Sequence, residues 1–377
     1  MDELTQILSD LVAIDSTNPG ILPGAPGEAE IAAALAHWLK AAGLEVDVQE
    51  VLPGRPNVVG ILRGAGGGKT LILNGHLDTV GANGMAQPHH PTVQDGRMYG
   101  RGTYDMKGGL TACMLAMKAA TRLNLAGDVI FCAVMDEELG GLGTQQISRQ
   151  YRADAAIIAE PTELQLVVAH RGFVFVEVET IGVAAHGSRP HLGVDAIFKM
   201  GKVLRALDEF DQHLQAHPTH ALLGSGSLHA SFIHGGQEPS TYPAQCLLTL
   251  ERRTIPGETP HSVQTEMDRM LAALAAADPA FQYTLRLGAS QPPMETPPDA
   301  EILPVILQAA RQVLGYDPQP GGVSYWTDAA TLWTAGIPSL LFGPLGAGAH
   351  AAEEWVDLQS VQTCAEVYLE TIRLFCQ

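Results

Sequence analysis

Histidine and acidic side chains follow several short apolar segments of this chain, and these are residue types that bind metals or transfer protons. One apolar segment ends in His76 and Asp78, and another ends in three consecutive acids at positions 136–138. A solvated turn would explain three adjacent acids as well as a binding site would. The rest of the sequence is therefore needed to distinguish a solvated turn from a binding site.

The pair His76 and Asp78 carries more information than a lone histidine at the end of a strand. Side chains two residues apart on a strand point to the same side. An aspartate there can accept the free imidazole N–H and so fix which ring nitrogen faces a metal. Glu137 and Glu138 are direct neighbours and point differently, so one can bind a metal while the other faces a metal-bound water. The pattern predicts a ligand beside a general base.

Three further residues stand at comparable places in the chain. Asp105 comes just before a predicted helix, Glu160 follows a predicted strand that begins at Ala155, and His350 follows the apolar segment "SLLFG". In an open α/β sheet, ligands bind beyond the carboxyl ends of the strands. Imidazole and carboxylate groups that converge there form a mixed nitrogen and oxygen set, which suits Zn²⁺, Co²⁺ or Mn²⁺. Each residue alone is weak evidence, but together they predict a metal site.

The elements that must hold these side chains are short apolar strands that alternate with helices. Strands are predicted from Thr70, over 129–135 and from Ala155, with a helix over 107–123. This order predicts an α/β fold with a mostly parallel sheet and helices on both faces. The length of 377 residues and the 46% of hydrophobic residues allow two domains with full cores.

The pattern changes at about Phe173. Residues 173–287 alternate with period two and then follow a β-α-β-β-α-β order, which predicts an inserted α+β domain of ferredoxin-like type. The Pro-rich segment 288–299 marks the return to the first domain. We therefore expect a metal-binding domain at 1–172 and 288–377.

Charge and composition exclude other classes of function. The 22 Lys and Arg residues against 41 Asp and Glu residues give a net charge of −19, which disfavours nucleic acids and anionic membranes. No signal peptide or membrane-length apolar segment is evident, so a cytoplasmic protein is expected. The five cysteines form no CxxC pair and are predicted to be reduced core residues. The segment "RGAGGGKT" has Arg63 where a phosphate-binding loop needs glycine, so it is interpreted as a flexible turn.

Seven segments carry a resemblance to a known family. They are "GHLDTV", "DGRMYGRGTYDMKGG", "VMDEELGG", "IIAEPT", "AAHGSRP", "ERRTIPGE" and "FGPLGAGAHAAEEWV". In this order they resemble the M20 metallopeptidases, which include acetylornithine deacetylase, succinyl-diaminopimelate desuccinylase and the glutamate carboxypeptidases. The resemblance spans essentially the whole chain.

The resemblance implies a hydrolase with two divalent metal ions, zinc first and cobalt or manganese as substitutes. Glu137 would be the catalytic base, and Asp78 would orient a ligand. The implied metal ligands are His76 and Glu160 for one ion, Glu138 and His350 for the other, and Asp105 as the bridge.

In the family the insertion is a lid that pairs with its copy in a second subunit, so a homodimer is implied. His186 would then stabilise an oxyanion in the partner's active site, and Arg253 would bind the substrate carboxylate, with Arg252 as its unresolved neighbour. Many members have Asn where this chain has Ser240, which leaves the substrate contact there open.

The roles of four further residues stay open or are expected to be minor. Tyr325 and Asp328 either line the pocket or support His350, whereas His89 and His90 are predicted to be surface residues.

The predicted function is cleavage of the amide bond of an N-acyl amino acid, as in acetylornithine deacetylase. A dipeptidase or carboxypeptidase on the same site is the first alternative, and a catalytically silent peptide- or metal-binding member is the second. The segment containing "PST" before Tyr242 favours the deacetylase branch.

Overall fold

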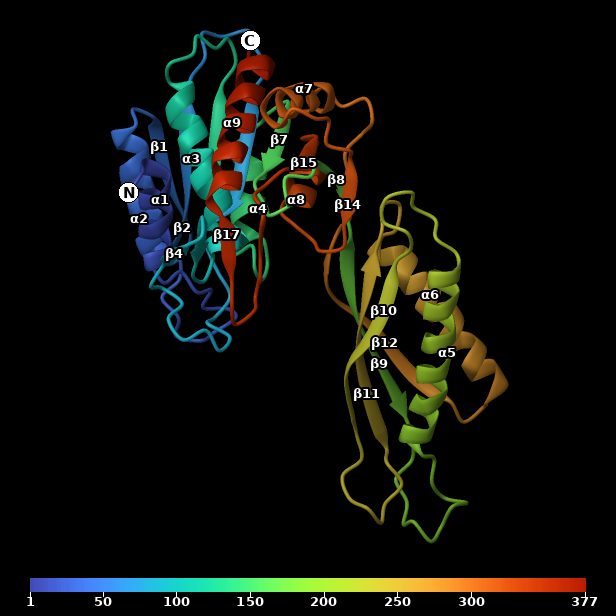
Figure 1. The fold of residues 1–377 in the computed structure, drawn as a ribbon. Coiled ribbons are helices and arrows are strands. Elements are labelled where there is room, and N and C mark those ends of the chain that lie inside the picture. Colours follow the sequence, from blue (N-terminus) through green and yellow to red (C-terminus); the bar gives the residue numbers. More distant parts are fainter. The chain divides into compact units, whose positions relative to one another are not determined.

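The computed structural model describes residues 1–377 as two compact units (Figure 1). The first unit comprises residues 1–168, 296–321 and 327–377, and the second comprises 169–295 with 322–326. The predicted insertion at 173–287 lies within the second unit.

A sheet with four parallel strands at its centre forms the frame of the first unit. The strand order is β1-β2-β6-β3-β7-β15-β8, and β13 and β14 pair with β8. The strands are β1 Glu45–Leu52, β2 Arg55–Leu62, β3 Leu71–His76, β6 Val129–Val134, β7 Ala155–Ile158, β8 Val167–His170, β13 Met294–Glu295, β14 Gly321–Val323 and β15 Ser339–Leu341. Strands β3, β6 and β7 are buried along their whole length, which explains their continuous apolar sequences.

The flanking strands of this sheet run antiparallel. Strands β1 and β2 form a hairpin around Gly54, whose φ of 71° favours glycine. Strand β2 then pairs antiparallel with β6, and β8 pairs antiparallel with β15. The predicted α/β fold is confirmed, and the parallel part is its centre.

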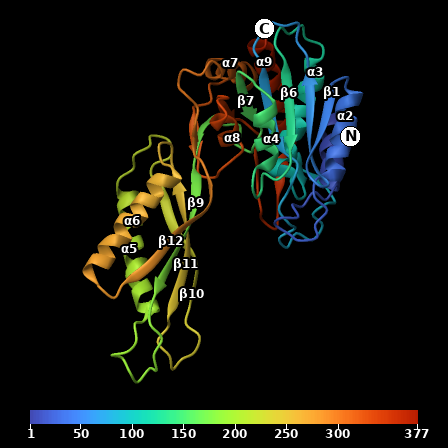
Figure 2. The same cartoon turned by 180° about the vertical axis from the view of Figure 1, so that it is seen from behind.

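Helices cover both faces of the sheet (Figures 1 and 2). Helices α3 and α9 pack on each other and share one core with α1, α2 and α7, while α4 and α8 pack against strands from the other face. The helices are α1 Glu3–Ala13, α2 Ala29–Ala41, α3 Gly108–Ala120, α4 Leu142–Gln150, α7 Ile302–Leu314, α8 Ala329–Thr334 and α9 Leu358–Phe375, with the short helix η1 at Thr103–Lys107.

A second, small antiparallel sheet joins two parts of the chain that are distant in sequence. Its order is β16-β17-β5-β4, formed by Gly346–Ala347, Trp355–Asp357, Arg97–Tyr99 and Thr92–Gln94. It therefore brings the chain just before η1 next to the chain just after His350.

The second unit is a four-stranded antiparallel sheet with two helices on one face. The sheet order is β10-β11-β9-β12, and α5 and α6 pack over a core of apolar side chains such as Val176 and Leu248. The elements are β9 Gly172–Ile181, α5 Ala196–Ala216, β10 Ser227–Gly235, β11 Gln245–Thr254, α6 Pro260–Ala277 and β12 Gln282–Gln291. This is the β-α-β-β-α-β order expected from the sequence.

Helix α5 continues to Ala216, beyond Leu207, which is the last of its buried apolar residues. Its last two turns are stabilised by polar side chains four residues apart, such as Arg205 with Glu209 and Gln212 with Asp208. Apolar periodicity cannot reveal such turns, because they face solvent.

All five cysteines are buried and form no disulfide, in agreement with the expected core positions. No helix combines the length and the apolar character that crossing a membrane requires.

Candidate active site and metal centre

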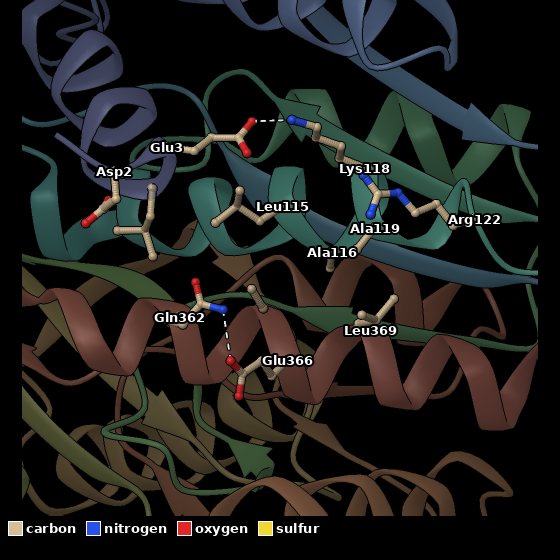
Figure 3. Close-up of a pocket in the computed structure, with 12 residues that line it drawn as sticks. Asp2, Glu3, Leu115, Ala116, Lys118, Ala119, Arg122, Gln362, Glu366 and Leu369 are labelled. Carbon is tan, nitrogen blue, oxygen red and sulfur yellow. Dashed lines mark hydrogen bonds and ion pairs between the residues drawn. The ribbon is translucent and has the colours of Figure 1, made fainter.

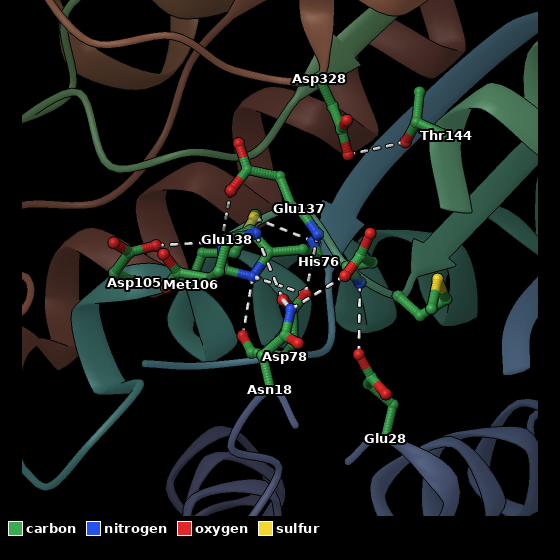
Figure 4. A network of polar contacts seen from close by, with 12 residues as sticks. Asn18, Glu28, His76, Asp78, Asp105, Met106, Glu137, Glu138, Thr144 and Asp328 are labelled. Atoms are coloured by element: carbon green, nitrogen blue, oxygen red, sulfur yellow. Dashed lines mark hydrogen bonds and ion pairs between the residues drawn. The ribbon is translucent and has the colours of Figure 1, made fainter. Parts of the chain in front are cut away.

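The predicted metal ligands come together at the carboxyl ends of the parallel strands. Figure 4 shows His76, Asp105 and Glu138 of this set. His76 is the last residue of β3, Glu138 follows β6, and Glu160 follows β7. Asp105 lies in η1, and His350 lies in the turn between β16 and β17. Because parallel strands share one direction, their ends deliver these side chains to a single edge of the sheet.

Asp105 lies between the two histidines. Its Oδ1 is 3.0 Å from Nε2 of His76, and its Oδ2 is 3.2 Å from Nε2 of His350. Glu160 Oε1 lies 3.6 Å from the same nitrogen of His76, and Glu138 Oε2 lies 3.0 Å from that of His350. The side chains thus form two groups that share the carboxylate of Asp105.

Glu137 lies at the edge of the first group. Its Oε2 is 4.0 Å from Nε2 of His76, and one ligand atom each from His76, Glu137 and Glu160 lie within 4.8 Å of one another. A side chain at this distance can reach a water held at the centre, as a general base must.

The residues present fit divalent metal ions. The buried Oε1 of Glu138 has no hydrogen-bond partner, although an unpaired buried carboxylate oxygen is costly. Imidazole nitrogen and carboxylate oxygen together are the donors that Zn²⁺, Co²⁺ and Mn²⁺ accept. A cation between them would satisfy that oxygen and offset the charge of the acids.

The pKa shifts at the centre record this concentration of negative charge. Burial disfavours a charged imidazole, yet the carboxylates of Glu160 and Asp105 outweigh it and hold the pKa of His76 well above its usual range. Burial, together with the charge of Glu160, raises the pKa of Glu137 well above its usual range. Burial also raises the pKa of Glu160 to about 8. Hydrogen bonds to Asp105 and Glu138 raise the pKa of His350 to about 10.

Asp78 orients His76 through its backbone and not through its carboxylate. Nδ1 of His76 donates to the carbonyl oxygen of Asp78 at 2.8 Å, whereas the nearest carboxylate oxygen is 3.7 Å away. This corrects the expected side-chain contact, because the ring turns back toward the chain that follows it. The hydrogen bond still places the proton on Nδ1 and leaves the lone pair of Nε2 for a metal.

The carboxylate of Asp78 holds the acidic turn instead. Oδ1 accepts from the backbone N–H of Glu137 at 3.1 Å, and Oδ2 accepts from that of Glu138 at 3.2 Å. Asn18 Nδ2 donates to the same Oδ2 at 2.8 Å. Burial raises the pKa of Asp78 to about 7.

A buried polar network behind the turn was missing from the sequence prediction (Figure 4). Figure 4 shows two members of this network, Asn18 and Glu28. Asn18 also donates to Oδ1 of Asp136 at 3.1 Å, and the same oxygen lies 3.2 Å from the guanidinium of Arg55. Arg55 in turn pairs with Glu28 at 2.5 Å, and Glu28 accepts from the backbone N–H of Asp136. Asp136, the first of the three acids, is therefore a structural residue, in a backbone conformation with φ of 68°. Only the three adjacent acids marked this place in the sequence.

Glycines close the space around the backbone of Glu160. A Cβ on Gly343 would lie 1.9 Å from the carbonyl oxygen of Glu160, and one on Gly109 would lie 2.1 Å from that of Ala159. Both distances are far below a van der Waals contact, so the strand end fits only because these positions lack side chains.

Comparison with known proteins identifies the family of this chain. Residues 72–374 match the sequence profile of peptidase family M20/M25/M40. The chain belongs to this family. Acetylornithine deacetylase from Myxococcus xanthus is 30% identical over 99% of this chain and 97% of its own length. N-formyl-4-amino-5-aminomethyl-2-methylpyrimidine deformylase from Halalkalibacterium halodurans is 28% identical over 100% of this chain and 95% of its own length.

Solved structures of M20 proteins have the same fold. Aminopeptidase PepT from Bacillus cereus superposes with a TM-score of 0.82 at 19% identity, covering 99% of this chain and 98% of its own. A dinuclear metal-binding M20 peptidase from Bacillus subtilis superposes with a TM-score of 0.77 at 16% identity, covering 99% and 97%. With its family and its cluster of metal-binding side chains, this M20 protein is a metal-dependent amidohydrolase.

In this M20 chain, Asp328 does not contact His350. It is buried and accepts from Thr144 Oγ1 at 2.7 Å, while the backbone carbonyl of His350 accepts from Asn83. Burial raises the pKa of Asp328 to about 7, and its charge raises the pKa of Glu137. No direct bond links Asp328 to His350, and both the pocket-lining role of Asp328 and an indirect support of His350 stay predictions.

The remaining candidate residues lie in the second unit. His186 is exposed, and its Nδ1 lies 2.8 Å from Ser188 Oγ. Gly187 N–H donates to the backbone oxygen of Ser240, so the segments of His186 and Ser240 lie side by side. The oxyanion role of His186 and the substrate role of Ser240 stay predictions.

The structure distinguishes Arg252 from Arg253. Arg252 is fully buried and pairs with Glu258 at 2.6 Å, so it is committed to the core of the second unit. Arg253 is 32% exposed and pairs with Glu251 at 2.8 Å. Arg253 therefore remains the candidate for binding a substrate carboxylate.

The other open residues lie at or near the surface. Tyr325 is 39% exposed. His90 is exposed as predicted, whereas His89 is half-buried with Nε2 at 3.4 Å from Asp15.

A cavity of about 390 Å³ in the first unit lies elsewhere, between α1, α3 and α9 (Figure 3). Two of its lining charges form the Lys118–Glu3 ion pair, and Gln362 donates to Glu366 at 2.9 Å. No histidine or cysteine lines it, so it offers no comparable set of metal ligands.

Proposed function

We propose that this protein is a dinuclear metal hydrolase that removes the acyl group from an N-acyl amino acid. The observation that carries the proposal is the carboxylate of Asp105, whose two oxygens face His76 at 3.0 Å and His350 at 3.2 Å. A carboxylate with a histidine on each side is suited to bridge two cations. Zinc is proposed as the resident ion, with cobalt or manganese able to replace it.

The proposed roles are those of metal ligand, general base and positioning residue. The proposed ligands are His76 and Glu160 for one ion, Glu138 and His350 for the other, and Asp105 for both. When bound, the ions would polarise the scissile carbonyl and acidify the attacking water. Glu137 takes the proton from that water and delivers it to the nitrogen of the leaving amine. Asp78 holds the backbone of Glu137 and so fixes the direction of its side chain.

The substrate class is supported by the two relatives, whose names describe a deacetylase and a deformylase. Both names denote removal of a small acyl group from nitrogen. We therefore propose an N-acyl amino acid as the substrate, with Arg253 as the partner of its carboxylate and Ser240, beyond the opposite end of β11, as a second substrate contact. A dipeptidase or carboxypeptidase would need a larger acyl side.

The assembly and the compartment complete the proposal. We propose a homodimer through the second unit, in which His186 of one subunit donates to the oxyanion at the other subunit's centre. Five buried cysteines without a disulfide support a reducing compartment, the cytoplasm.

The test is a hydrolysis screen of the zinc-loaded and the cobalt-loaded protein, with metal content measured on the same samples. N-acetylornithine, other N-acetyl amino acids, N-succinyl-diaminopimelate and dipeptides are compared by kcat/KM. We expect the highest kcat/KM on an N-acetyl amino acid. A higher value on dipeptides would replace the deacylase with an exopeptidase, and two bound ions without any hydrolysis would indicate a silent member.

A further inference from the structure

A buried ion pair lies beside the metal centre and joins residues far apart in the chain. Nη1 of Arg101 lies 2.6 Å from Oε2 of Glu354, and both side chains are at most 1% exposed. Neither residue belongs to the proposed ligands or the proposed base. A buried pair of this kind adds little net stability unless its other hydrogen-bonding groups are also satisfied, so its remaining contacts indicate its role.

Glu354 holds the backbone of the segment that carries Asp105. Its Oε1 accepts from the N–H of Tyr104 at 2.9 Å and from the N–H of Asp105 at 3.1 Å. Its Oε2 accepts from the N–H of Gly102 at 3.0 Å. Three backbone donors within residues 102–105 bind this one carboxylate and so fix the position of Asp105 itself.

Arg101 uses its remaining donors on the two neighbouring segments. Nε donates to the carbonyl of Gly81 at 3.0 Å, and Nη2 donates to the carbonyls of Ala82 at 3.1 Å and Ala351 at 2.7 Å. Residues 81 and 82 follow Asp78, and Ala351 follows His350. One ion pair therefore binds three segments that carry side chains of the centre.

The two groups of proposed metal ligands, one with His76 and one with His350, depend on this ion pair to different degrees. His76 ends a buried strand that has a hydrogen-bonded neighbour on each side, β6 and β7. His350 lies in an irregular turn, its side chain is 52% exposed, and its φ is 62°. Asn83 donates to the carbonyl of His350, and Arg101 donates to that of Ala351. These hydrogen bonds supply for the turn the support that neighbouring strands supply for His76.

We propose that Arg101 and Glu354 are positioning residues that set Asp105 against His350, so that losing either one releases chiefly the metal ion held by Glu138 and His350. The inference rests on the proposed dinuclear function. It adds that the two ions are held in different ways. The sheet positions the ligands of the first ion, and the Arg101–Glu354 pair positions those of the second.

The experiment measures metal binding directly in the full-length protein. Glu354→Gln replaces one carboxylate oxygen by an NH₂ group that faces backbone donors, and Arg101→Lys keeps the charge but cannot reach three carbonyls. Apo proteins are titrated with Co²⁺, followed by visible absorption, and bound metal is counted by mass spectrometry after dialysis. Glu353→Gln is the matched control, because Glu353 is the exposed neighbour of Glu354.

We expect two ions in the wild type and in the control. Both variants should keep one ion with unchanged affinity and bind the second about 10- to 100-fold more weakly, as is typical when support behind a ligand is lost. High Co²⁺ should then restore the second absorption signal.

Three outcomes would contradict this expectation in different ways. Two ions with wild-type affinity in a folded variant would overturn the inference, and so would an equal loss of both ions. If Glu354→Gln does not fold, Arg101→Lys decides by the same titration. Fewer than two ions in the wild type would instead contradict the proposed dinuclear function.

Discussion

The carboxylate of Asp78 holds the backbone of Glu137, because Oδ1 of Asp78 accepts from the N–H of Glu137 at 3.1 Å. The other carboxylate oxygen does the same for Glu138 at 3.2 Å. One buried acid thus fixes both the proposed base and a proposed ligand, while its carbonyl fixes His76. Three predictions concern this arrangement and its surroundings, and two concern residues of the second unit.

Asp78→Asn should lower kcat about 10- to 100-fold and weaken metal binding. The amide replaces one acceptor by a donor, which must then face either the N–H of Glu137 or the N–H of Glu138 and Asn18. Steady-state kinetics and a metal titration measure the two effects. Asp95→Asn is the control, since Asp95 is exposed in a turn with φ of 50° that Asn tolerates. Wild-type kinetics in Asp78→Asn would show that the turn needs no carboxylate.

Glu137→Gln should retain metal and lose hydrolysis, whereas Glu138→Ala should lose metal. The first change removes the group that accepts the proton but no proposed ligand. The second removes the carboxylate 3.0 Å from Nε2 of His350. General base catalysis typically contributes 10²- to 10⁴-fold, so kcat of Glu137→Gln should fall by about that factor. Metal analysis beside an activity assay separates the two, and a fully active Glu137→Gln would exclude the proposed base.

Arg55→Met should destabilise the first unit by about 3 kcal/mol, because it leaves Glu28 and Asp136 buried without their cation. The Glu28 side chain is 0% exposed, so water cannot replace the lost partner. Thermal unfolding followed by circular dichroism measures the change. Arg63→Met is the control, since that guanidinium also pairs with two acids but is 58% exposed. Equal effects of the two substitutions would mean that burial does not matter here.

His170 should make the metal-free protein less stable in acid. Burial lowers the pKa of His170 from 6.5 to about 4, and its Nε2 has no partner. Between these pH values the unfolded chain binds a proton that the folded chain refuses, so stability falls as pH falls from about 6.5 to 4. The loss at the lower end is about 3 kcal/mol.

The variant His170→Asn isolates this effect, because its amide can still donate to the carbonyl of Arg171 but does not titrate. Urea unfolding of both proteins in chelator, at several pH values, measures the difference. We expect the stability difference between variant and wild type to grow in favour of the variant below pH 6.5. A difference independent of pH would contradict the assignment.

His186→Ala and Glu137→Gln should each be inactive alone, and a mixture should regain activity if His186 acts on the partner's centre. Random pairing of subunits yields heterodimers with one centre that has both residues. The measurement is kcat of heterodimers purified with two different tags. Inactive heterodimers of verified composition would show that His186 does not act across subunits.

The sequence singled out the proposed metal ligands because several of them stand close to the end of an apolar strand. His76, Glu138 and Glu160 follow strands whose apolar runs are evident, so their convergence follows from sheet geometry. The same reasoning found the order of elements in the second unit.

What the sequence could not show are contacts between distant segments. Asn18 lies 60 residues before Asp78, and Glu354 lies 253 residues after Arg101. Polar residues in loops have no periodicity, so nothing local marks their partners. The one available signal was Arg101 between Gly100 and Gly102, both with positive φ, in a segment that leads directly to Asp105. The side-chain contact expected for Asp78 failed for a related reason, since the direction of a loop after a strand is not set by alternation.

The glycines at 109 and 343 have a consequence for anyone who diversifies this enzyme. Added methyl groups there would overlap the main chain at Ala159 and Glu160, with separations of 2.1 and 1.9 Å. Variant libraries selected for new specificity should therefore keep glycine at both positions, although glycine has no side chain that could contact a substrate. Substitutions that change specificity are therefore expected at other positions, because the space around the backbone of Glu160 cannot hold an added side chain.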